Sequence, residues 1–239
     1  MRIPWNTLKI TGLIICITGL YAFSDRRAER REITGIQVEF VGEDQLYLTE
    51  GMVNKLLIQN YGSLRNVPQD AVVLNTMESV LRTCDMVKNA EVFLAVDGTL
   101  HAKIIQRHPI GRVAGTTSFY LDDQGLKMPL SPNHSARVPI ITGKITGKSL
   151  EDVYEILKYI NADSFLSKNV IGIHIEDEAD YRLKFRMEDF LVRLGDSTDL
   201  DRKFKNFKAF YLKATQDQTL AQYREVNLAF SNQVVCTKI

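Results

Sequence analysis

The chain has 239 residues, and at roughly 150 residues per domain this length allows one large domain or two small ones. Hydrophobic residues make up 45% and charged residues 25% of the chain, a composition typical of folded globular proteins that excludes a disordered or collagen-like chain. The formal net charge of +1 gives no general electrostatic attraction to nucleic acid, and three cysteines are too few for a disulfide scaffold.

An uncharged apolar segment lies near the N-terminus. We predict a transmembrane helix over residues 10–24; counting from Pro4 to Phe23 gives about 30 Å of helix, which matches the hydrocarbon core of a bilayer. Residues 1–9 would then be a short cytoplasmic tail and 25–32 a juxtamembrane linker. Six of the 30 basic residues lie within 1–32, so the positive charge is concentrated beside this segment.

The same segment is also typical of a cleaved signal peptide. Small residues at Ala22 and Ser24 have the spacing of a cleavage site before Asp25. Charge does not settle the orientation, because four arginines follow the segment and a count of positive charge alone would place the large C-terminal part in the cytoplasm. That rule weakens when a long domain follows. Anchor and signal peptide, and the side of the membrane, therefore stay open from the residues alone.

Residues 33–113 are predicted to form a first α+β module with the order β-α-α-β-β. Because two helices lie between the first and second strands, they should cover one face of a three-stranded sheet. Asp97-Gly98 is a strong hairpin turn between the last two strands. The predicted strands are Ile36–Val41, Ala90–Val96 and Leu100–Gln106, and the predicted helices begin after the N-cap Thr49 and span Leu74–Cys84.

Residues 114–239 are predicted to form a mostly antiparallel β module with two helices. The module opens with a hairpin whose turn is Asp122–Gly125, and Ser149 is the predicted N-cap of the first helix. The last stretch, Tyr223–Cys236, is predicted to be one strand, bent near Ser231-Asn232. The other predicted strands are Val138–Thr142, Val170–Glu176, Tyr181–Met187 and Phe190–Leu194, and the predicted helices are Leu150–Asn161 and Leu200–Ala214.

The residues indicate no active site. Asp122 and Asp123 could form a carboxylate pair for acid–base chemistry, but turn residues before a glycine need no catalytic role. Cys84 is predicted to lie in the core. We expect no enzyme activity, cofactor, metal or small-molecule substrate. The histidines lack metal-ligand spacing; they are His101, His108, His134 and His174.

One predicted helix carries aromatic residues interleaved with basic ones. Phe204, Phe207 and Tyr211 recur at helical spacing, and Lys205 and Lys208 lie between them. Aromatic and basic residues together are found in nucleic-acid-binding helices. Aromatics on one face with charges on the other also describe an ordinary core-packed helix. We interpret this helix as core-packed and predict no nucleic-acid partner.

Five stretches, in the same order along the chain, resemble the bacterial cell-division family FtsQ, also called DivIB. The first is similar to the opening strand of a POTRA domain, the second to the join between that domain and the next, and the last to the terminal strand of Bacteroidetes members. Ala229 stands where many members have arginine. The stretches are Ile36–Phe40, Val87–Val92 with Ile104–Arg112, Phe119–Gly125, Val138–Gly143 and Tyr223–Cys236.

This resemblance implies a bitopic scaffold of the divisome. Family members have one inner-membrane helix, a cytoplasmic N-terminus and periplasmic POTRA and β domains at the division septum, and they are not enzymes. They link early and late division proteins and bind an FtsL/FtsB-like pair and other divisome membrane proteins. The resemblance thus implies contact with the lipid bilayer through residues 4–23. A secreted or anchored POTRA-containing protein of envelope transport or assembly stays the alternative, because a fold does not determine a function.

The resemblance also implies a binding site at the C-terminal strand, where the partner adds a strand to the edge of the sheet. Ordinary packing within the sheet is the competing interpretation of the same residues. We predict that one face of this strand holds Phe230, Asn232, Val234 and Cys236, and that the opposite face holds Ser231 and Val235.

Overall fold

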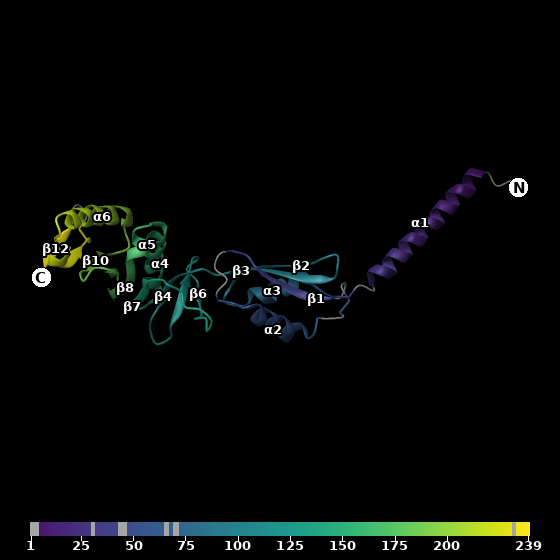
Figure 1. Cartoon of the computed structure of the whole chain (residues 1–239), viewed down its shortest axis with the longest axis horizontal. Helices are drawn as coiled ribbons and strands as arrows, with labels where there is room; N and C mark the ends of the chain where they lie inside the picture. The colour runs from purple at the N-terminus through teal and green to yellow at the C-terminus, as the bar shows by residue number, and fades with distance from the viewer. Residues whose placement is uncertain (1–4, 30–31, 43–46, 65–66, 69–71, 231–232) are drawn as a thin grey trace. The chain divides into compact units, whose positions relative to one another are not determined.

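The computed structural model describes residues 5–29, 32–42, 47–64, 67–68, 72–230 and 233–239, and within 5–29 the side chains of 9–23. The chain divides into two compact units, Met1–Gln106 and Arg107–Ile239. Both units combine helices with a β-sheet (Figure 1). The protein is therefore of the mixed α+β class that the sequence predicts.

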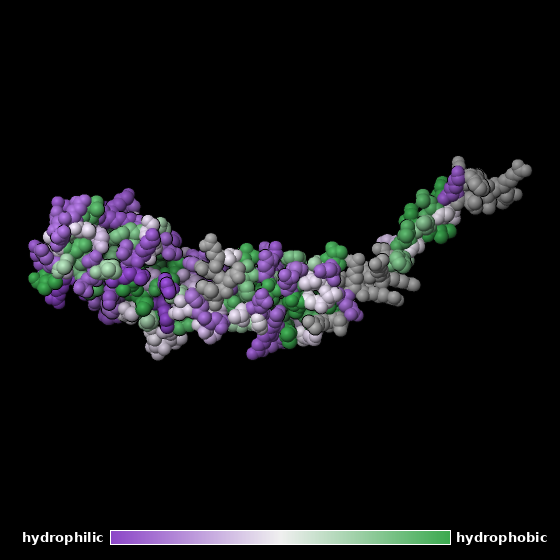
Figure 2. Space-filling view, in the orientation of Figure 1, coloured by the Kyte–Doolittle hydropathy of each residue, from purple (hydrophilic) through white to green (hydrophobic). Residues whose placement is uncertain are grey.

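Helix α1 (Trp5–Glu29) contains the predicted segment 10–24. The described side chains of this helix are exposed, and Figure 2 shows hydrophobic residues along its middle. In the described part of the chain, no helix has both the length and the apolar character needed to cross a membrane. The large exposed apolar side chains of α1 are Ile10, Leu13, Ile14, Ile15, Ile17, Leu20, Tyr21 and Phe23.

The sheet of the first unit has the order β1-β3-β2. Strand β3 (Thr99–Gln106) pairs in parallel with β1 (Gly35–Phe40) and antiparallel with β2 (Val87–Leu94). Helices α2 (Glu50–Tyr61) and α3 (Leu74–Arg82) lie between β1 and β2 along the chain, so the predicted order β-α-α-β-β is confirmed.

Alternation of apolar and polar residues explains why this sheet is covered on one face only. Every second residue of β3 is buried, with Leu100, Ala102 and Ile104 fully inaccessible. Helix α2 packs against β1 and α3 packs against β2, and they bury Leu57 and Leu81 completely. Each helix thus contributes one apolar stripe to a single core.

The second unit contains a nine-stranded sheet with the order β12-β11-β10-β9-β8-β7-β4-β5-β6. The strands are β4 (Pro109–Val113), β5 (Phe119–Asp122), β6 (Lys127–Met128), β7 (Ile140–Gly143), β8 (Val170–Asp177), β9 (Asp180–Phe185), β10 (Leu191–Gly195), β11 (Tyr223–Asn227) and β12 (Val235–Lys238). The helices are α4 (Gly147–Ala162), α5 (Leu166–Asn169), α6 (Leu200–Gln216) and the short 3-10 helix η2 (Leu220–Gln222).

Five of the eight strand pairs in this sheet are antiparallel, so the predicted mostly antiparallel character is confirmed, and the other three pairs are parallel. Strands β4 and β7, β7 and β8, and β10 and β11 pair in parallel. Two of these pairs follow from the helices: α4 connects β7 to β8 and α6 connects β10 to β11, and a helical crossover returns the chain in its original direction. The four-residue helix α5 was not predicted.

The boundary between the units lies after Gln106 rather than after Val113. Strand β4 pairs with β5 and β7, and so belongs to the sheet of the second unit. The residues after Gln106, which the sequence analysis assigned to the first module, therefore belong to the second core, to which Ile110 and Val113 contribute buried side chains.

Helix α4 begins three residues earlier than predicted. Its N-cap is Thr146, and the predicted cap Ser149 is the third helical residue of a reciprocal capping box. The Thr146 N–H donates to Ser149 Oγ at 2.8 Å, and the Ser149 N–H donates to Thr146 Oγ1 at 3.2 Å. Helices α4 and α6 cover one face of the sheet, with Val153, Leu157 and Phe207 in its core.

Candidate partner-binding edge

The predicted strand Tyr223–Cys236 is two strands in the structure. Strand β11 pairs in parallel with β10, and β12 turns back to pair antiparallel with β11. Strand β11 ends at Asn227, and the N–H of the next residue, Leu228, donates to the backbone carbonyl of Arg193 at 2.8 Å. Strand β12 consequently forms one end of the nine-stranded sheet.

The side chains at β12 alternate between the two faces of the sheet. Val234 and Cys236 pack partly buried against the core, and Cys236 lies opposite the buried Val226. Val235 lies opposite Asn227 and is 39% exposed. The structure thus places Val234 and Cys236 on one side and Val235 on the other.

Phe230 lies in the connection between β11 and β12 rather than in a strand. It is 49% exposed and follows Ala229, whose N–H donates to the side-chain oxygen of Asn227 at 2.9 Å. Phe230 therefore does not share a strand face with Val234 and Cys236, because the chain turns between them. The predicted site residues Ser231 and Asn232 lie outside the described residues.

Because β12 lies at one end of the sheet, it can pair with a strand of another protein. A strand at the end of a sheet presents a row of backbone N–H and C=O groups that can pair with another chain. The opposite end is formed by β6, which has only two residues, and very short edge strands are one way in which proteins limit such pairing. Strand β12 has four residues and is the more suitable edge.

The sequence reasoning missed two residues of β10, the strand that pairs with β11. Arg193 donates from Nε and Nη2 to the Asp180 carboxylate at 3.1 and 2.9 Å, and this hydrogen bond raises the pKa of the guanidinium. Gly195 has a φ of +72°, and a Cβ there would lie 2.9 Å from the Cβ of Ala229. A glycine directly after the apolar residues of a strand was the available signal for the second.

Cys236 has the environment of a packed residue. Burial raises the pKa of its thiol, so the reactive thiolate is disfavoured. The position of this side chain against the core supports a structural contribution to β12.

The acidic turn Asp122–Gly125 is a structural hairpin. Asp122 is fully buried, and its Oδ1 accepts hydrogen bonds from the N–H groups of Gln124 and Leu126 at 3.0 and 2.7 Å. Its other carboxylate oxygen lies 3.4 Å from Nη1 of Arg107. These contacts occupy the Asp122 carboxylate, which leaves it unavailable to a substrate.

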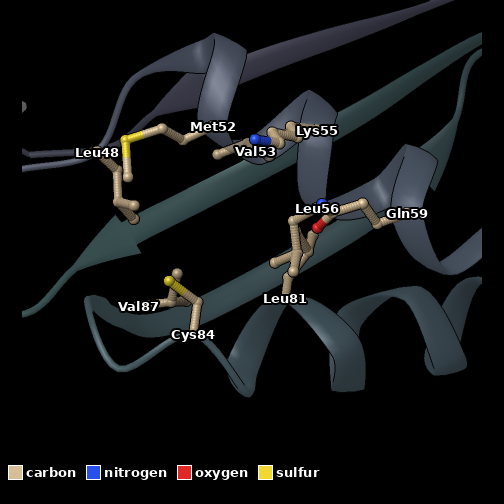
Figure 3. Close-up of a pocket in the computed structure, with 9 residues that line it drawn as sticks. All are labelled: Leu48, Met52, Val53, Lys55, Leu56, Gln59, Leu81, Cys84 and Val87. Carbon is tan, nitrogen blue, oxygen red and sulfur yellow. The ribbon is translucent and has the colours of Figure 1, made fainter.

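A groove of about 350 Å³ lies between α2 and α3 in the first unit (Figure 3). Its wall includes Met52 and Leu56 from α2, Leu81 from α3, and Cys84. Cys84 is half-buried and follows the end of α3, whereas the sequence predicted it in the core. Within the described residues, no group of three or more His, Cys, Asp or Glu side chains could hold a metal ion.

One comparison with known proteins identifies a family. The model of the family "FtsQ/DivIB, C-terminal related" matches residues 108–237. Among solved structures, the major extracytoplasmic domain of the trans isomer of the division protein DivIB from Geobacillus stearothermophilus is similar, with 17% identity and a TM-score of 0.35 over 47% of this chain and 95% of that one. No curated protein matches the sequence. Because the family model covers more than half of the chain, the protein belongs to the FtsQ/DivIB C-terminal related family.

Proposed function

We propose that this protein is a non-catalytic scaffold of bacterial cell division that binds an FtsL/FtsB-like pair through β12. Membership of the FtsQ/DivIB family supports the division role. The observation that carries the binding proposal is the end position of β12 in the sheet, beside the exposed Phe230. A partner strand that pairs with β12 would gain main-chain hydrogen bonds, and its alternate side chains would contact Val235 and Phe230.

We further propose that α1 anchors the protein in the inner membrane through residues 4–23, with the N-terminus in the cytoplasm and both units in the periplasm. The exposed apolar side chains of α1 support this proposal, since they find no partner surface in water and would be stabilised by lipid. An anchor requires that the segment is retained. The mass of the chain purified from membranes tests this, and a mature chain that begins at Asp25 would exclude the anchor.

Replacing Phe230 with alanine is expected to weaken capture of the FtsL/FtsB-like pair at least about tenfold, because exposed aromatic residues beside a binding edge are frequent binding hot spots. The full chain, purified in detergent, is tested against the purified partner pair. In cells depleted of the wild-type protein, the variant should leave filaments that the wild-type copy resolves.

Leu212→Ala is the matched control, because Leu212 is a large apolar residue that is 62% exposed and lies on α6 rather than in β12. It should capture the pair normally. A second variant ends the chain at Ala229 and removes β12 while it keeps the buried Leu228. Capture by a folded Phe230→Ala variant at the wild-type level would argue against this edge, and normal septation after depletion would argue against the division role.

A further inference from the structure

The face of the nine-stranded sheet opposite α4 and α6 is hollowed between β7 and β10. The depression has a volume of about 360 Å³. At its centre lies Gly172 of β8, which has no side chain to fill the space between its neighbours Ile140 on β7 and Lys184 on β9. The lining of the depression includes Ile140 on β7, Gly172 and Glu176 on β8, Arg182 and Lys184 on β9, and Leu191 on β10.

Two exposed aliphatic side chains flank this depression. Ile140 and Leu191 are 47% and 39% exposed, and the strand register places them in one row across the sheet, Ile140–Gly172–Lys184–Leu191. A row with an apolar residue at each end, and a gap at Gly172, offers a concave apolar surface. An aliphatic side chain from another molecule would lose water contact on both sides there.

One basic residue that lines the depression, Lys184, has no acidic partner among the described residues, and the acidic Glu225 lies two strands away from it at the end of the same row. Glu176 already pairs with Arg182 at 3.3 Å, and Asp180 pairs with Arg193 at 2.9 Å. Within the described part of the chain, Lys184 makes no ion pair, and the buried Nε of Arg182 has no hydrogen-bond acceptor. The Lys184 ammonium is therefore the cationic donor that remains for a ligand carboxylate, because Arg182 is engaged by Glu176.

We propose that this depression binds a peptide segment of another protein in which aliphatic residues alternate with acidic ones. An aliphatic side chain fills the space above Gly172, and a neighbouring carboxylate pairs with Lys184. A peptide can place a single carboxylate beside Lys184, whereas an anionic lipid surface would also bring negative charge against Glu176 and Asp180. None of the residues that line the depression belongs to β12. The two proposed sites can therefore be tested independently of each other.

The probes are short fluorescein-labelled peptides that repeat Ile-Glu, Ile-Gln or Ile-Lys, titrated against the full chain in detergent with fluorescence anisotropy as the readout. We expect the Ile-Glu peptide to bind at least about tenfold more tightly than the Ile-Lys peptide, with a preference that weakens at high salt. The chain that ends at Ala229 should retain this binding, which separates the depression from strand addition at β12.

Two variants test the site: one reverses the charge of Lys184, and the other fills the space above Gly172. Lys184→Glu should weaken binding of the Ile-Glu peptide at least about tenfold. Gly172→Val should do the same by filling the depression; a Cβ at Gly172 meets the Ile140 carbonyl oxygen at 3.4 Å and Lys184 Cβ at 3.6 Å, so the strand has room for it. Lys168→Glu, on an exposed residue of α5, is the matched charge reversal and should bind like the wild type.

Equal binding of the acidic and basic peptides, or unchanged binding by Lys184→Glu, would overturn the proposal. Self-association of the chain that Lys184→Glu abolishes would identify a second copy as the occupant. Adsorption to phosphatidylglycerol vesicles that this variant abolishes would identify a lipid surface. Either result would also overturn the proposal. If Gly172→Val fails to fold, the Lys184→Glu and Lys168→Glu pair still decides the outcome.

Discussion

Replacing Gly143 with alanine is expected to destabilise the protein by about 3–5 kcal/mol, a large share of the total stability of a typical domain. Gly143 ends β7 with a φ of +100°, which L residues rarely adopt, and a Cβ there would lie 2.1 Å from the carbonyl oxygen of Ile175. That oxygen is held in place, because it accepts a hydrogen bond from the Lys144 N–H at 3.0 Å. Urea unfolding of the full chain, followed by circular dichroism, measures the effect.

Gly147→Ala is the matched control. Gly147 is the first residue of α4, its φ is not positive, and no atom lies within 4 Å of the position of a Cβ. Alanine there should leave stability unchanged or raise it by up to about 1 kcal/mol, because it reduces the conformational freedom of the unfolded chain. If Gly143→Ala unfolded within about 1 kcal/mol of the wild type, the close approach of β7 and β8 would not be the constraint described here.

The case of Gly143 shows where sequence reasoning ends. The apolar run Val138–Thr142 predicts a strand that stops near this glycine, and the structure has one at β7. The reason for the glycine lies in Ile175, on a strand far along the chain. Only the parallel pairing of β7 with β8 brings that carbonyl close, and local periodicity contains no information on which strands become neighbours.

Strand β4 illustrates a second kind of miss. Pro109 and Gly111 both disfavour strands, so the sequence analysis predicted no strand here and assigned these residues to the end of the first module. In the structure, Pro109 is the first residue of β4, a position where proline is tolerated in a strand. It also buries Gly111 beneath α4, where a Cβ would lie 2.5 Å from a methyl group of Leu157. The glycine is needed because helix and strand approach closely, which is a property of the tertiary packing.

The candidate edge was predictable in position but not in detail. A run of apolar residues at the C-terminus predicts strand, and the family resemblance placed the binding edge there. The sequence predicted a bend near Ser231-Asn232 but still one strand, because Leu228 and Phe230 continue the apolar alternation. The decisive contact is the hydrogen bond from the Leu228 N–H to Arg193, which is not local in sequence.

Helix α6 provides the second large expected effect, and it confirms the interpretation of the aromatic stripe as core. Phe204 and Phe207 are fully buried, and the Phe207 ring centroid lies 4.9 Å from that of Phe185 on β9. A stripe packed on the sheet is unavailable for stacking on nucleic-acid bases. Phe207→Ala should cost about 3–5 kcal/mol, because it removes a buried ring and leaves a cavity in a closely packed interior.

Urea unfolding again measures the loss, with Leu212→Ala as the control on the same helix. Leu212 is 62% exposed, so its truncation should change stability by no more than about 0.5 kcal/mol. Phe207→Leu separates ring loss from cavity formation: it keeps most of the buried volume and should recover part of the stability. Equal unfolding midpoints for Phe207→Ala and Leu212→Ala would contradict the packing of α6 on the sheet, because Phe207 is buried there and Leu212 is exposed.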